Sequence, residues 1–444
     1  MLDQTKLDQT KLDQIRDEFF EGKIKTQNLE TEVFLRAYAS NPEKVADACR
    51  DAAQIRCGLL EKKSGKTLSL IKNTNLNNST LVEGSTILSG IESKIGAAMI
   101  PMGYVGPAKI CGQYVSPDEE IYIPLATNEA ALVAGVQRGL KAISMAGGLK
   151  TLVHFDGMAR APLVEAPDIY AARKFVDELA NNPALIAEFQ ACVPDPFVRL
   201  KGIEPYQLGV KVFLRFVFTS GDAMGMNGVT KASAEITRYI LRKKPDWKLI
   251  TISGNLCTDK KNAHINVLHG RGKSVETEVV ISDEVLAKVF KAGVNGRSVE
   301  RVVFHKCYLG SALSGTISGF NVNAANTVAA FYAATGQDLA HVVSSSSCFV
   351  QADALDGGLR FTVSFPCLEL ATVGGGTLFG TAREALELLG CGRYGSSAED
   401  NQSVKRLAEI AAAAITALDL NTACAQAAGY EMADSHVKLA RGEK

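Results

Sequence analysis

Hydrophobic residues recur at helical spacing in both terminal parts of the chain. Near the N-terminus this spacing covers residues 31–39 (TEVFLRAYA) and 42–63, within a region, 15–62, that we expect to be helical. Two Ala-rich segments, 324–336 and 402–420, predict long helices in the C-terminal half. The polar repetition LDQTKLDQTKLDQ at the start is interpreted as a frayed helix start or an extension, and we assign it no function.

The pattern between residues 161 and 253 alternates between strands and helices. Short runs rich in β-branched and aromatic residues predict strands, and two segments with helical spacing predict helices. In chain order these are strand 161–165, helix 167–182, strands 197–209 and 210–218, helix 222–244 and strand 247–253. The order βαββαβ is that of the ferredoxin-like unit.

We therefore predict an α+β fold in which a large, mostly helical domain carries an inserted ferredoxin-like βαββαβ domain. A chain of 444 residues is long enough for two or three domains. The predicted parts are an N-terminal helical region (1–90), the large domain (91–160 and 264–444), the inserted domain (161–251) and a connecting loop (252–263).

Composition and charge exclude several classes of protein. The 48 basic and 48 acidic residues balance, whereas a nucleic-acid-binding protein usually has a basic excess. Ten cysteines without a CxxC pair indicate free thiols in a reducing compartment, and six histidines without ligand spacing indicate no metal site. The N-terminus lacks a signal sequence, and no apolar run reaches the roughly 18–20 residues that span a bilayer. We expect a cytoplasmic protein, or one in an organelle matrix if a presequence was removed.

A glycine-containing turn joins a predicted strand to a helix at residues 219–229 (TSGDAMGMNGV). Asp222 can cap that helix, and Gly225 allows close approach to the backbone N–H groups that follow. Such a helix start can bind a dinucleotide phosphate, although a simple cap is the commoner use. The motif is neither GxGxxG nor a P-loop.

Three further motifs carry charged residues whose role the pattern alone leaves open. In residues 124–143 a helix is expected to open at Thr127 or Asn128, which puts Glu129 in its first turn. Arg138 and Lys141 share one face of that helix, either as a phosphate clamp or simply in solvent. The charged run 259–261 lies between small polar residues and an apolar, strand-like run, which fits a solvated loop or a tight buried turn.

Two single residues stand at positions that raise a question. Asp338 ends an Ala-rich helix, where a carboxylate opposes the helix dipole and requires a compensating cation or a function. His436 lies in a polar C-terminal tail, where a histidine is usually just exposed.

Together and in this order, the motifs resemble those of the class I 3-hydroxy-3-methylglutaryl-CoA reductases. The resemblance covers roughly residues 85–440 and rests on PLATNEAALV, DGMARAPLVE, RFVFTSGDAMGMN, SGNLCTDKKNAHINVLHGRGKSV, FNVNAANTVAAFYAATGQD and TVGGGT. It implies a soluble enzyme that reduces 3-hydroxy-3-methylglutaryl-CoA (HMG-CoA) to mevalonate and CoA by two hydride transfers, in isoprenoid and sterol biosynthesis. It also implies that the inserted domain binds the dinucleotide.

The same resemblance assigns roles to individual positions. It implies catalytic roles for Glu129, Lys260, Asp338 and His436. It implies that the substrate is held by Arg160, Ser253, Lys261, Lys306 and Asn326, and the CoA phosphates by Arg138 and Lys141. It implies that the dinucleotide is held by Asp222, Met224, Gly225, Met226, Asn227 and Arg441.

The resemblance also implies a homodimer with shared active sites, assembled as a homotetramer, and NADPH as reductant without a metal. Asp195 and Pro196 stand where members that use NADPH carry polar and basic side chains, so NADH stays open as the reductant; Arg199 and Arg441 could supply the missing charge. Lys94 departs from the family pattern in the dimer-interface motif, which reads ESKIG here. An oxidoreductase that acts on another acyl-CoA, an enzyme that works in the oxidative direction and an inactive scaffold homologue also stay open.

Overall fold

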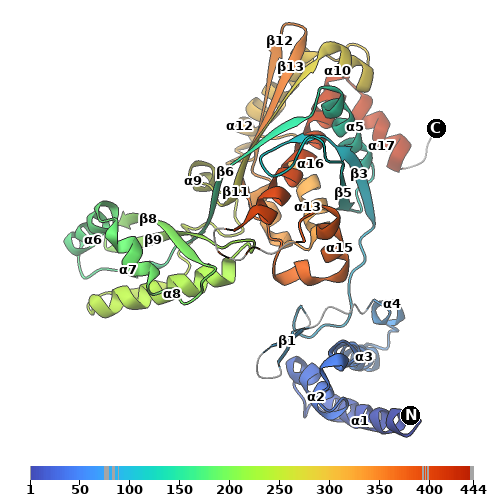
Figure 1. The fold of residues 1–444 in the computed structure, drawn as a ribbon, viewed down its shortest axis with the longest axis vertical. Helices are drawn as coiled ribbons and strands as arrows, with labels where there is room; N and C mark the ends of the chain where they lie inside the picture. The colour runs from blue at the N-terminus through green and yellow to red at the C-terminus, as the bar shows by residue number, and fades with distance from the viewer. Residues whose placement is uncertain are drawn as a thin grey trace. The chain divides into compact units, whose positions relative to one another are not determined.

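The computed structural model describes residues 2–74, 80–82, 86–88, 90–392, 395, 397 and 400–440. The chain forms two compact units, one of residues 1–101 with 378–384 and one of residues 102–377 with 385–444 (Figure 1).

The first unit is mainly helical, as the periodic spacing near the N-terminus predicted. Its core joins α1, α2 and α3 through residues such as Ile15, Phe34 and Ala48. The pentapeptide repetition lies inside α1, and α3 ends at Gly65, which adopts φ 67°. The elements are α1 (Leu2–Phe20), η1 (Thr26–Asn28), α2 (Leu29–Arg36), η2 (Pro42–Lys44), α3 (Val45–Ser64), α4 (Ser69–Lys72), β1 (Thr80–Val82) and β2 (Thr86–Leu88).

The second unit is built on a nine-stranded sheet and a separate two-stranded one, β3 (Met102–Ala108) with β5 (Ile121–Ala126). The main path of the large sheet runs β10-β7-β9-β6-β11-β13-β12, with β4 on β6 and β8 on β9. Its strands are β4 (Ile110–Cys111), β6 (Leu149–Arg160), β7 (Leu163–Glu165), β8 (Arg199–Leu208), β9 (Lys211–Thr219), β10 (Lys248–Thr251), β11 (Gly272–Ser282), β12 (Phe349–Leu355) and β13 (Gly358–Leu368).

One end of this sheet is the ferredoxin-like part, which confirms the predicted fold class. The strands β10, β7, β9 and β8 are neighbours in that order, and every pair is antiparallel. The accompanying helices are α6 (Ile169–Asn181), α7 (Ala184–Gln190) and α8 (Met226–Lys243). The side chain of Asp168 caps α6, whose apolar residues Ala172, Phe175 and Leu179 are buried. The sequence analysis did not predict α7.

The long strand β6 connects the two parts of the sheet. It pairs with β11 along most of its length and with β9 at its last residues, Met158–Arg160. The predicted boundary at residue 160 therefore falls inside a continuous sheet, so Arg160 lies where the ferredoxin-like strands meet the larger part.

The helices of the larger part surround α16 (Gln402–Ala427), which packs on α5, α11, α13, β6 and β11. The α5 to α14 elements of this part are α5 (Leu132–Met145), α9 (His264–His269), α10 (Asp283–Val289), α11 (Gly296–Val303), η3 (Phe304–Gly310), α12 (Ser311–Ser314), α13 (Ala324–Thr335), η4 (Leu339–His341) and α14 (Val342–Ser345). Further along the chain follow η5 (Gly375–Leu378), α15 (Gly380–Leu388) and α17 (Glu431–Ala440); residues 378–384 of η5 and α15 are counted with the first unit.

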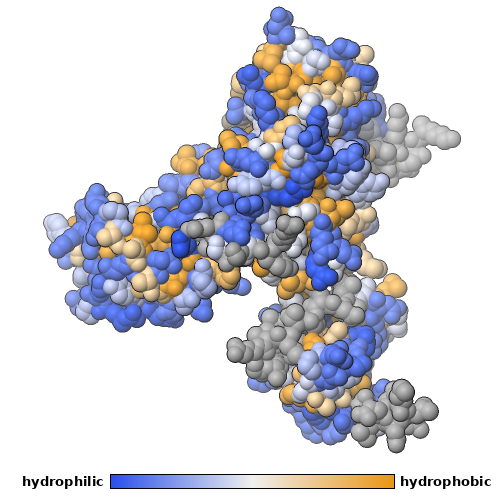
Figure 2. All heavy atoms as spheres, viewed as in Figure 1, coloured by the Kyte–Doolittle hydropathy of each residue, from blue (hydrophilic) through white to orange (hydrophobic). Residues whose placement is uncertain are grey.

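Within the described residues, α16 is the one helix long and apolar enough to cross a membrane, and its most apolar window is 100% buried inside the protein. A long helix was predicted over residues 402–420, but no uninterrupted apolar run of membrane-spanning length was found there, because Lys405, Arg406 and Glu409 interrupt it. A core helix passes the same test, so the finding is weak evidence for a membrane span. On the face drawn in Figure 2, hydrophilic residues cover most of the surface of both units.

Candidate active site

The loop after β10 has an unusual backbone. Asn255, Thr258 and Lys260 adopt φ values of 63°, 46° and 56°, although none of them is glycine. Residues other than glycine rarely enter this left-handed region, and such outliers cluster at functional sites. The side chain of Thr258 is hydrogen-bonded to that of Asn266 on α9, which ties the loop to the following helix. The run after the loop is thus a helix, where a strand-like segment was predicted.

Lys260 pairs with Asp338 across this loop. The distance between Lys260 Nζ and Asp338 Oδ2 is 2.8 Å, and both side chains are partly exposed. Burial acts to raise the pKa of Asp338, but the hydrogen bonds from Lys260 and from the Ala340 amide lower it overall. Lys260 is the compensating cation that the sequence analysis required.

The reason given for that requirement was wrong. The helix α13 ends at Thr335 with Gly336 as its left-handed cap, and Asp338 begins the next helical turn, η4. There its carboxylate accepts a hydrogen bond from the Ala340 N–H at 3.1 Å. Asp338 is therefore a favourable N-cap and does not oppose a helix dipole.

A buried ionic network lies directly behind this pair. His341 Nε2 is 3.6 Å from Asp338 Oδ2, and His341 Nδ1 is 2.6 Å from Glu369 Oε2. Arg271 forms an ion pair with Glu369 and a second one with Asp259 Oδ1, at 3.1 Å. The side chains of His341, Glu369 and Arg271 are fully buried. The network holds Asp338 and the loop residue Asp259 in fixed positions.

Burial lowers the pKa of His341 to about 4, helped by the charge of Arg271. The imidazole is therefore neutral near pH 7. Since Nδ1 then donates to Glu369, Nε2 presents a lone pair toward Asp338. Because neutral His341 donates no hydrogen bond to Asp338 Oδ2, this oxygen remains available to accept one from Lys260.

This pKa predicts a pH dependence of stability. Between about pH 6.5 and 4 the unfolded chain binds a proton at residue 341 that the folded protein does not bind, so stability falls as the pH falls. Between pH 7 and 5 the parent should lose roughly 1–2 kcal/mol more stability than His341→Gln, which has no group to titrate there. Melting temperatures at both pH values measure this. A difference in stability that is the same at both pH values does not bear on the prediction. If both proteins lost the same stability between pH 7 and 5, the lowered pKa of His341 would be contradicted.

Arg160 approaches the loop from the other side. Its guanidinium donates to Thr230 Oγ1 at 3.0 Å and to Ser253 Oγ at 2.9 Å, and it lies 3.6 Å from Asp259 Oδ2. Burial acts to raise the pKa of the neighbouring Cys257, but hydrogen bonds with Ser253 and the charge of Arg160 lower it overall. The structure thus brings Arg160, Ser253, Lys260 and Asp338 together.

The remaining two cations of the predicted substrate set are exposed. Lys261 Nζ donates to the backbone oxygen of Asp259 at 3.1 Å. Lys306 lies on η3 with an exposed side chain. Both remain predicted substrate contacts.

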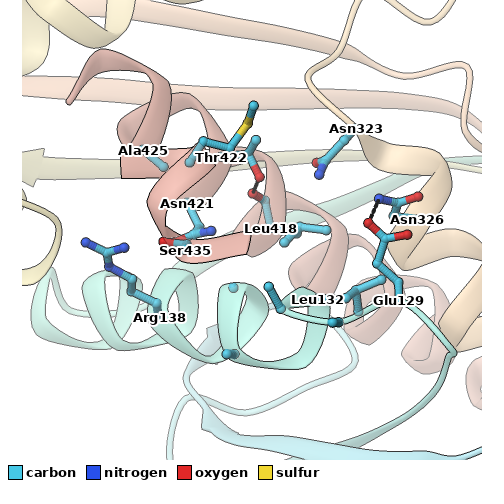
Figure 3. A pocket seen from close by; sticks show the side chains of 15 residues that line it. Glu129, Leu132, Arg138, Asn323, Asn326, Leu418, Asn421, Thr422, Ala425 and Ser435 are labelled. Carbon is cyan, nitrogen blue, oxygen red and sulfur yellow. Dashed lines mark hydrogen bonds between the residues drawn. The ribbon is translucent and has the colours of Figure 1, made fainter. Parts of the chain in front are cut away.

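A second group of predicted residues lines a cavity of about 230 Å³. Figure 3 shows Glu129 and Asn326 at one end, where Asn326 Nδ2 is 3.5 Å from Glu129 Oε1, and Arg138 at the other. Glu129 lies in the turn before α5, which starts at Leu132 and not at Thr127 or Asn128 as predicted. The carboxylate of Glu129 is therefore placed by this turn and by Asn326, and not by the first turn of a helix.

A buried acid supports this cavity from behind. Asp419, on α16, accepts hydrogen bonds from the N–H groups of Val322 at 3.1 Å and Asn323 at 3.0 Å. Its burial raises its pKa to about 6, although these two hydrogen bonds act in the opposite direction. The contact fixes the start of α13, which carries Asn326.

The two groups of residues are separate in the chain as described. Among the described residues between 102 and 435, no hydrogen bond or ion pair joins the Lys260–Asp338 group to the Glu129–Asn326 group. Ser435 on α17 lines the cavity, and the backbone of His436 follows it in that helix. The side chain of His436 and the whole of Arg441 lie outside what the structure describes.

The predicted dinucleotide loop leads into α8, but Asp222 does not cap that helix as predicted. The carboxylate of Asp222 accepts from the Val404 and Gly395 N–H groups at 2.9 and 2.7 Å, so it caps α16 and not α8. Gly225, with φ 92°, is the residue before α8, and a Cβ there would collide with Ser220 Oγ. The missing Cβ of Gly225 therefore makes room for the Ser220 side chain, and the binding of a dinucleotide phosphate at the start of α8 stays a prediction.

The other predicted residues of this loop have different surroundings. Met224 packs against the ferredoxin-like core, Met226 Sδ accepts from Arg271 Nη2 at 2.9 Å, and Asn227 is exposed. Within the described residues no group of three or more His, Cys, Asp or Glu is arranged to hold a metal ion.

The sequence analysis missed Arg271, His341 and Glu369 as site residues. Glu369 gave a signal that was overlooked, because it is a single acid in the otherwise apolar end of a strand, FPCLEL. A charge at such a position requires a buried partner. His341 and Arg271 gave no comparable signal, because they meet Glu369 only in the folded chain.

Comparisons with known proteins agree with these motifs. Residues 52–441 match the family model described as hydroxymethylglutaryl-coenzyme A reductase. The 3-hydroxy-3-methylglutaryl-coenzyme A reductase of Aeropyrum pernix is 42% identical over 91% of this chain and 93% of its own length. The 3-hydroxy-3-methylglutaryl-coenzyme A reductase of Pyrococcus abyssi is 38% identical over 88% of this chain and 93% of its own length. A solved class II reductase from Streptococcus pneumoniae, bound to NADPH, has a TM-score of 0.58 at 17% identity and covers 84% of this chain and 96% of its own.

Proposed function

Because this chain belongs to the hydroxymethylglutaryl-coenzyme A reductase family, we propose that it reduces HMG-CoA to mevalonate and CoA in two hydride transfers, with NADPH as the reductant. The observation that carries the proposal is the ion pair of 2.8 Å between Asp338 and Lys260, whose loop also contacts Arg160 through Asp259. When bound at the start of α8, the dinucleotide supplies the hydride. The reaction belongs to isoprenoid and sterol biosynthesis, in the cytoplasm.

In the first half of the reaction, negative charge develops on the thioester oxygen. The Lys260 ammonium stabilises this charge, and Asp338 keeps the ammonium protonated. Arg160, Ser253, Lys261 and Lys306 supply hydrogen bonds and positive charge for the carboxylate end of the substrate. His436 protonates the CoA thiolate that leaves.

In the second half, the aldehyde oxygen becomes an alcohol and requires a proton. Glu129 supplies it, and Asn326 orients the carboxyl group through the contact at 3.5 Å. A carboxyl group that donates near neutral pH requires a site closed to water, since burial favours its protonated form.

We propose that each active site combines the Lys260 group of one chain with the Glu129 group of a second, in a homodimer that pairs further into a tetramer. What supports this is the lack of a polar contact between the two groups among the described residues between 102 and 435 of one chain. Neither group alone contains both the ammonium and the proton-donating carboxyl that the chemistry requires.

Shared sites predict complementation between two inactive variants. Lys260→Ala and Glu129→Ala, each inactive alone, should regain about a quarter of the parent activity when co-expressed at equal levels. Half of the dimers are then mixed, and one of the two sites in each mixed dimer is intact. The control is a homodimer in which both chains carry both substitutions, and it should stay inactive. If the co-expressed pair also stays inactive although mixed dimers are isolated, each site belongs to a single chain.

The choice between NADPH and NADH depends on Asp195. Its Oδ1 accepts from the Phe197 N–H at 2.9 Å, and its Oδ2 lies 3.7 Å from a Cβ built at Gly228, in the first turn of α8. A carboxylate at this place repels a 2′-phosphate. Two cations are proposed to offset this repulsion. They are Arg199, which is close to Asp195 in the sequence, and Arg441.

Measuring kcat/KM with each reductant, from the absorbance of the reduced nicotinamide, tests both the reaction and this choice. We expect the reduced nicotinamide to be oxidised only when HMG-CoA is present, with a preference for NADPH. Asp195→Ser should strengthen the preference for NADPH. Asp246→Ser, which changes an exposed acid beyond α8, is the matched control and should change neither value. A preference for NADH above tenfold, or about 1.4 kcal/mol, would overturn the NADPH assignment. No turnover with either would favour a scaffold role, and turnover only from mevalonate would favour the oxidative direction.

A further inference from the structure

Arg138 is held in one orientation by the end of α10. Its Nε donates to the Val289 carbonyl at 3.1 Å, its Nη2 donates to the Phe290 carbonyl, and its guanidinium lies 5.3 Å from the centre of the Phe290 ring. These contacts occupy one edge of the planar group. The other terminal nitrogen, Nη1, faces Glu431.

Glu431 bridges two cations with its two oxygens. The distance from Arg138 Nη1 to Oε1 is 3.4 Å, and the distance from Lys291 Nζ to Oε2 is also 3.4 Å. An anion with several acceptor oxygens between an arginine and a lysine is the arrangement that a phosphate group makes. All three side chains are partly exposed, so these ion pairs can open at little cost.

Glu431 is also the first residue of α17. Gly429 separates α17 from α16; it adopts φ 77°, and no atom lies within 4 Å of the place that a Cβ would take there. Glycine tolerates a wider range of backbone angles than other residues, and no neighbouring atom fills the space beside this one. Met432 and Ser435 of α17 form part of the wall of the cavity that contains Glu129 and Asn326. The contact of Glu431 with Arg138 thus connects α5 to the start of the helix that contains His436.

We propose that Glu431 occupies the position of a CoA phosphate, so that CoA displaces it from Arg138 and Lys291 and frees the start of α17. The inference rests on the proposed function, because it takes Arg138 as a CoA contact. Since carboxylate and phosphate cannot both hold Nη1 of Arg138, docking of α17 weakens CoA binding and CoA weakens docking to the same degree. Glu431 thereby couples the arrival and departure of CoA to the helix of His436.

Calorimetric titration with CoA tests the competition. Glu431→Gln removes the charge and keeps the size, and it should bind CoA about threefold to tenfold more tightly, the range for opening two partly exposed ion pairs. Asp434→Asn, which changes an exposed acid of the same helix, is the matched control and should bind like the parent. Pantetheine, which has no phosphate, should bind all three proteins equally. Unchanged or weaker CoA binding by Glu431→Gln, or an equal gain with pantetheine, would overturn the proposal.

Hydrogen exchange of the α17 backbone supplies a second measurement. In the parent, CoA should speed amide exchange at residues 431–435, whereas Glu431→Gln should exchange quickly with or without CoA. Slower exchange in the parent on adding CoA would contradict the release of α17. If CoA binds none of the three proteins, the proposed function fails together with this inference. If it binds all three equally and the reductase assay succeeds, only the role of Glu431 fails.

Discussion

Replacing Lys260 by alanine is expected to lower kcat by about 10²–10³-fold, the usual cost of removing a group that stabilises a developing oxyanion. Lys260 stands on a strained loop, 2.8 Å from Asp338, whose carboxylate keeps its ammonium protonated. The stabilisation acts on the charge that forms during hydride transfer and not on the bound thioester. The KM for HMG-CoA should therefore change much less than kcat.

The neighbouring lysine provides a contrast in the same loop. Lys261→Ala removes a predicted contact to the bound substrate, so it should mainly raise KM. Both variants should fold normally, because the Lys260–Asp338 pair is partly exposed and its loss costs less than about 1 kcal/mol. Melting temperatures verify this. A Lys260→Ala enzyme that keeps kcat within tenfold of the parent would exclude Lys260 as the oxyanion-stabilising group.

The fold could be predicted well where the sequence pattern is local. The alternation of period-two and period-3.6 segments between residues 161 and 253 sufficed for the ferredoxin-like unit, because each of its elements has its own apolar face. The seven-residue helix α7 was missed, since so short a segment shows little periodicity. The continuity of β6 into both parts of the sheet is a long-range pairing that no local pattern encodes.

The candidate site could be predicted only in part, for a related physical reason. The unfavourable charge attributed to Asp338 correctly required a cation, although Asp338 is in fact an N-cap. Asp222 was assigned to the helix that follows it, yet its carboxylate caps α16, about 180 residues further along the chain. His341 and Arg271 were missed because their function depends on a buried acid that folding brings to them.

His436 lies on α17 next to a residue of the cavity wall. Ser435 lines the cavity with Glu129 and Asn326, and His436 follows it in α17. An imidazole with a reference pKa near 6.5 can donate a proton at neutral pH and regain it afterwards. Only the first half of the reaction expels a thiolate, so the two half-reactions should depend differently on this residue.

Replacing His436 by glutamine should therefore reduce HMG-CoA reduction by roughly 10²–10⁴-fold, the range for loss of a general acid. Reduction of added mevaldehyde should stay within a few-fold of the parent, because its oxygen takes a proton from Glu129 and no thiolate leaves. His154→Gln, which changes a half-exposed histidine on β6, is the matched control and should affect neither rate. The measurement is kcat for each substrate with the same reductant. Glutamine keeps hydrogen-bonding groups but cannot donate a proton as imidazolium does, so a merely structural role of His436 would lower both rates alike. Equal losses for thioester and aldehyde would assign His436 to substrate binding and leave the thiolate to be protonated by another group.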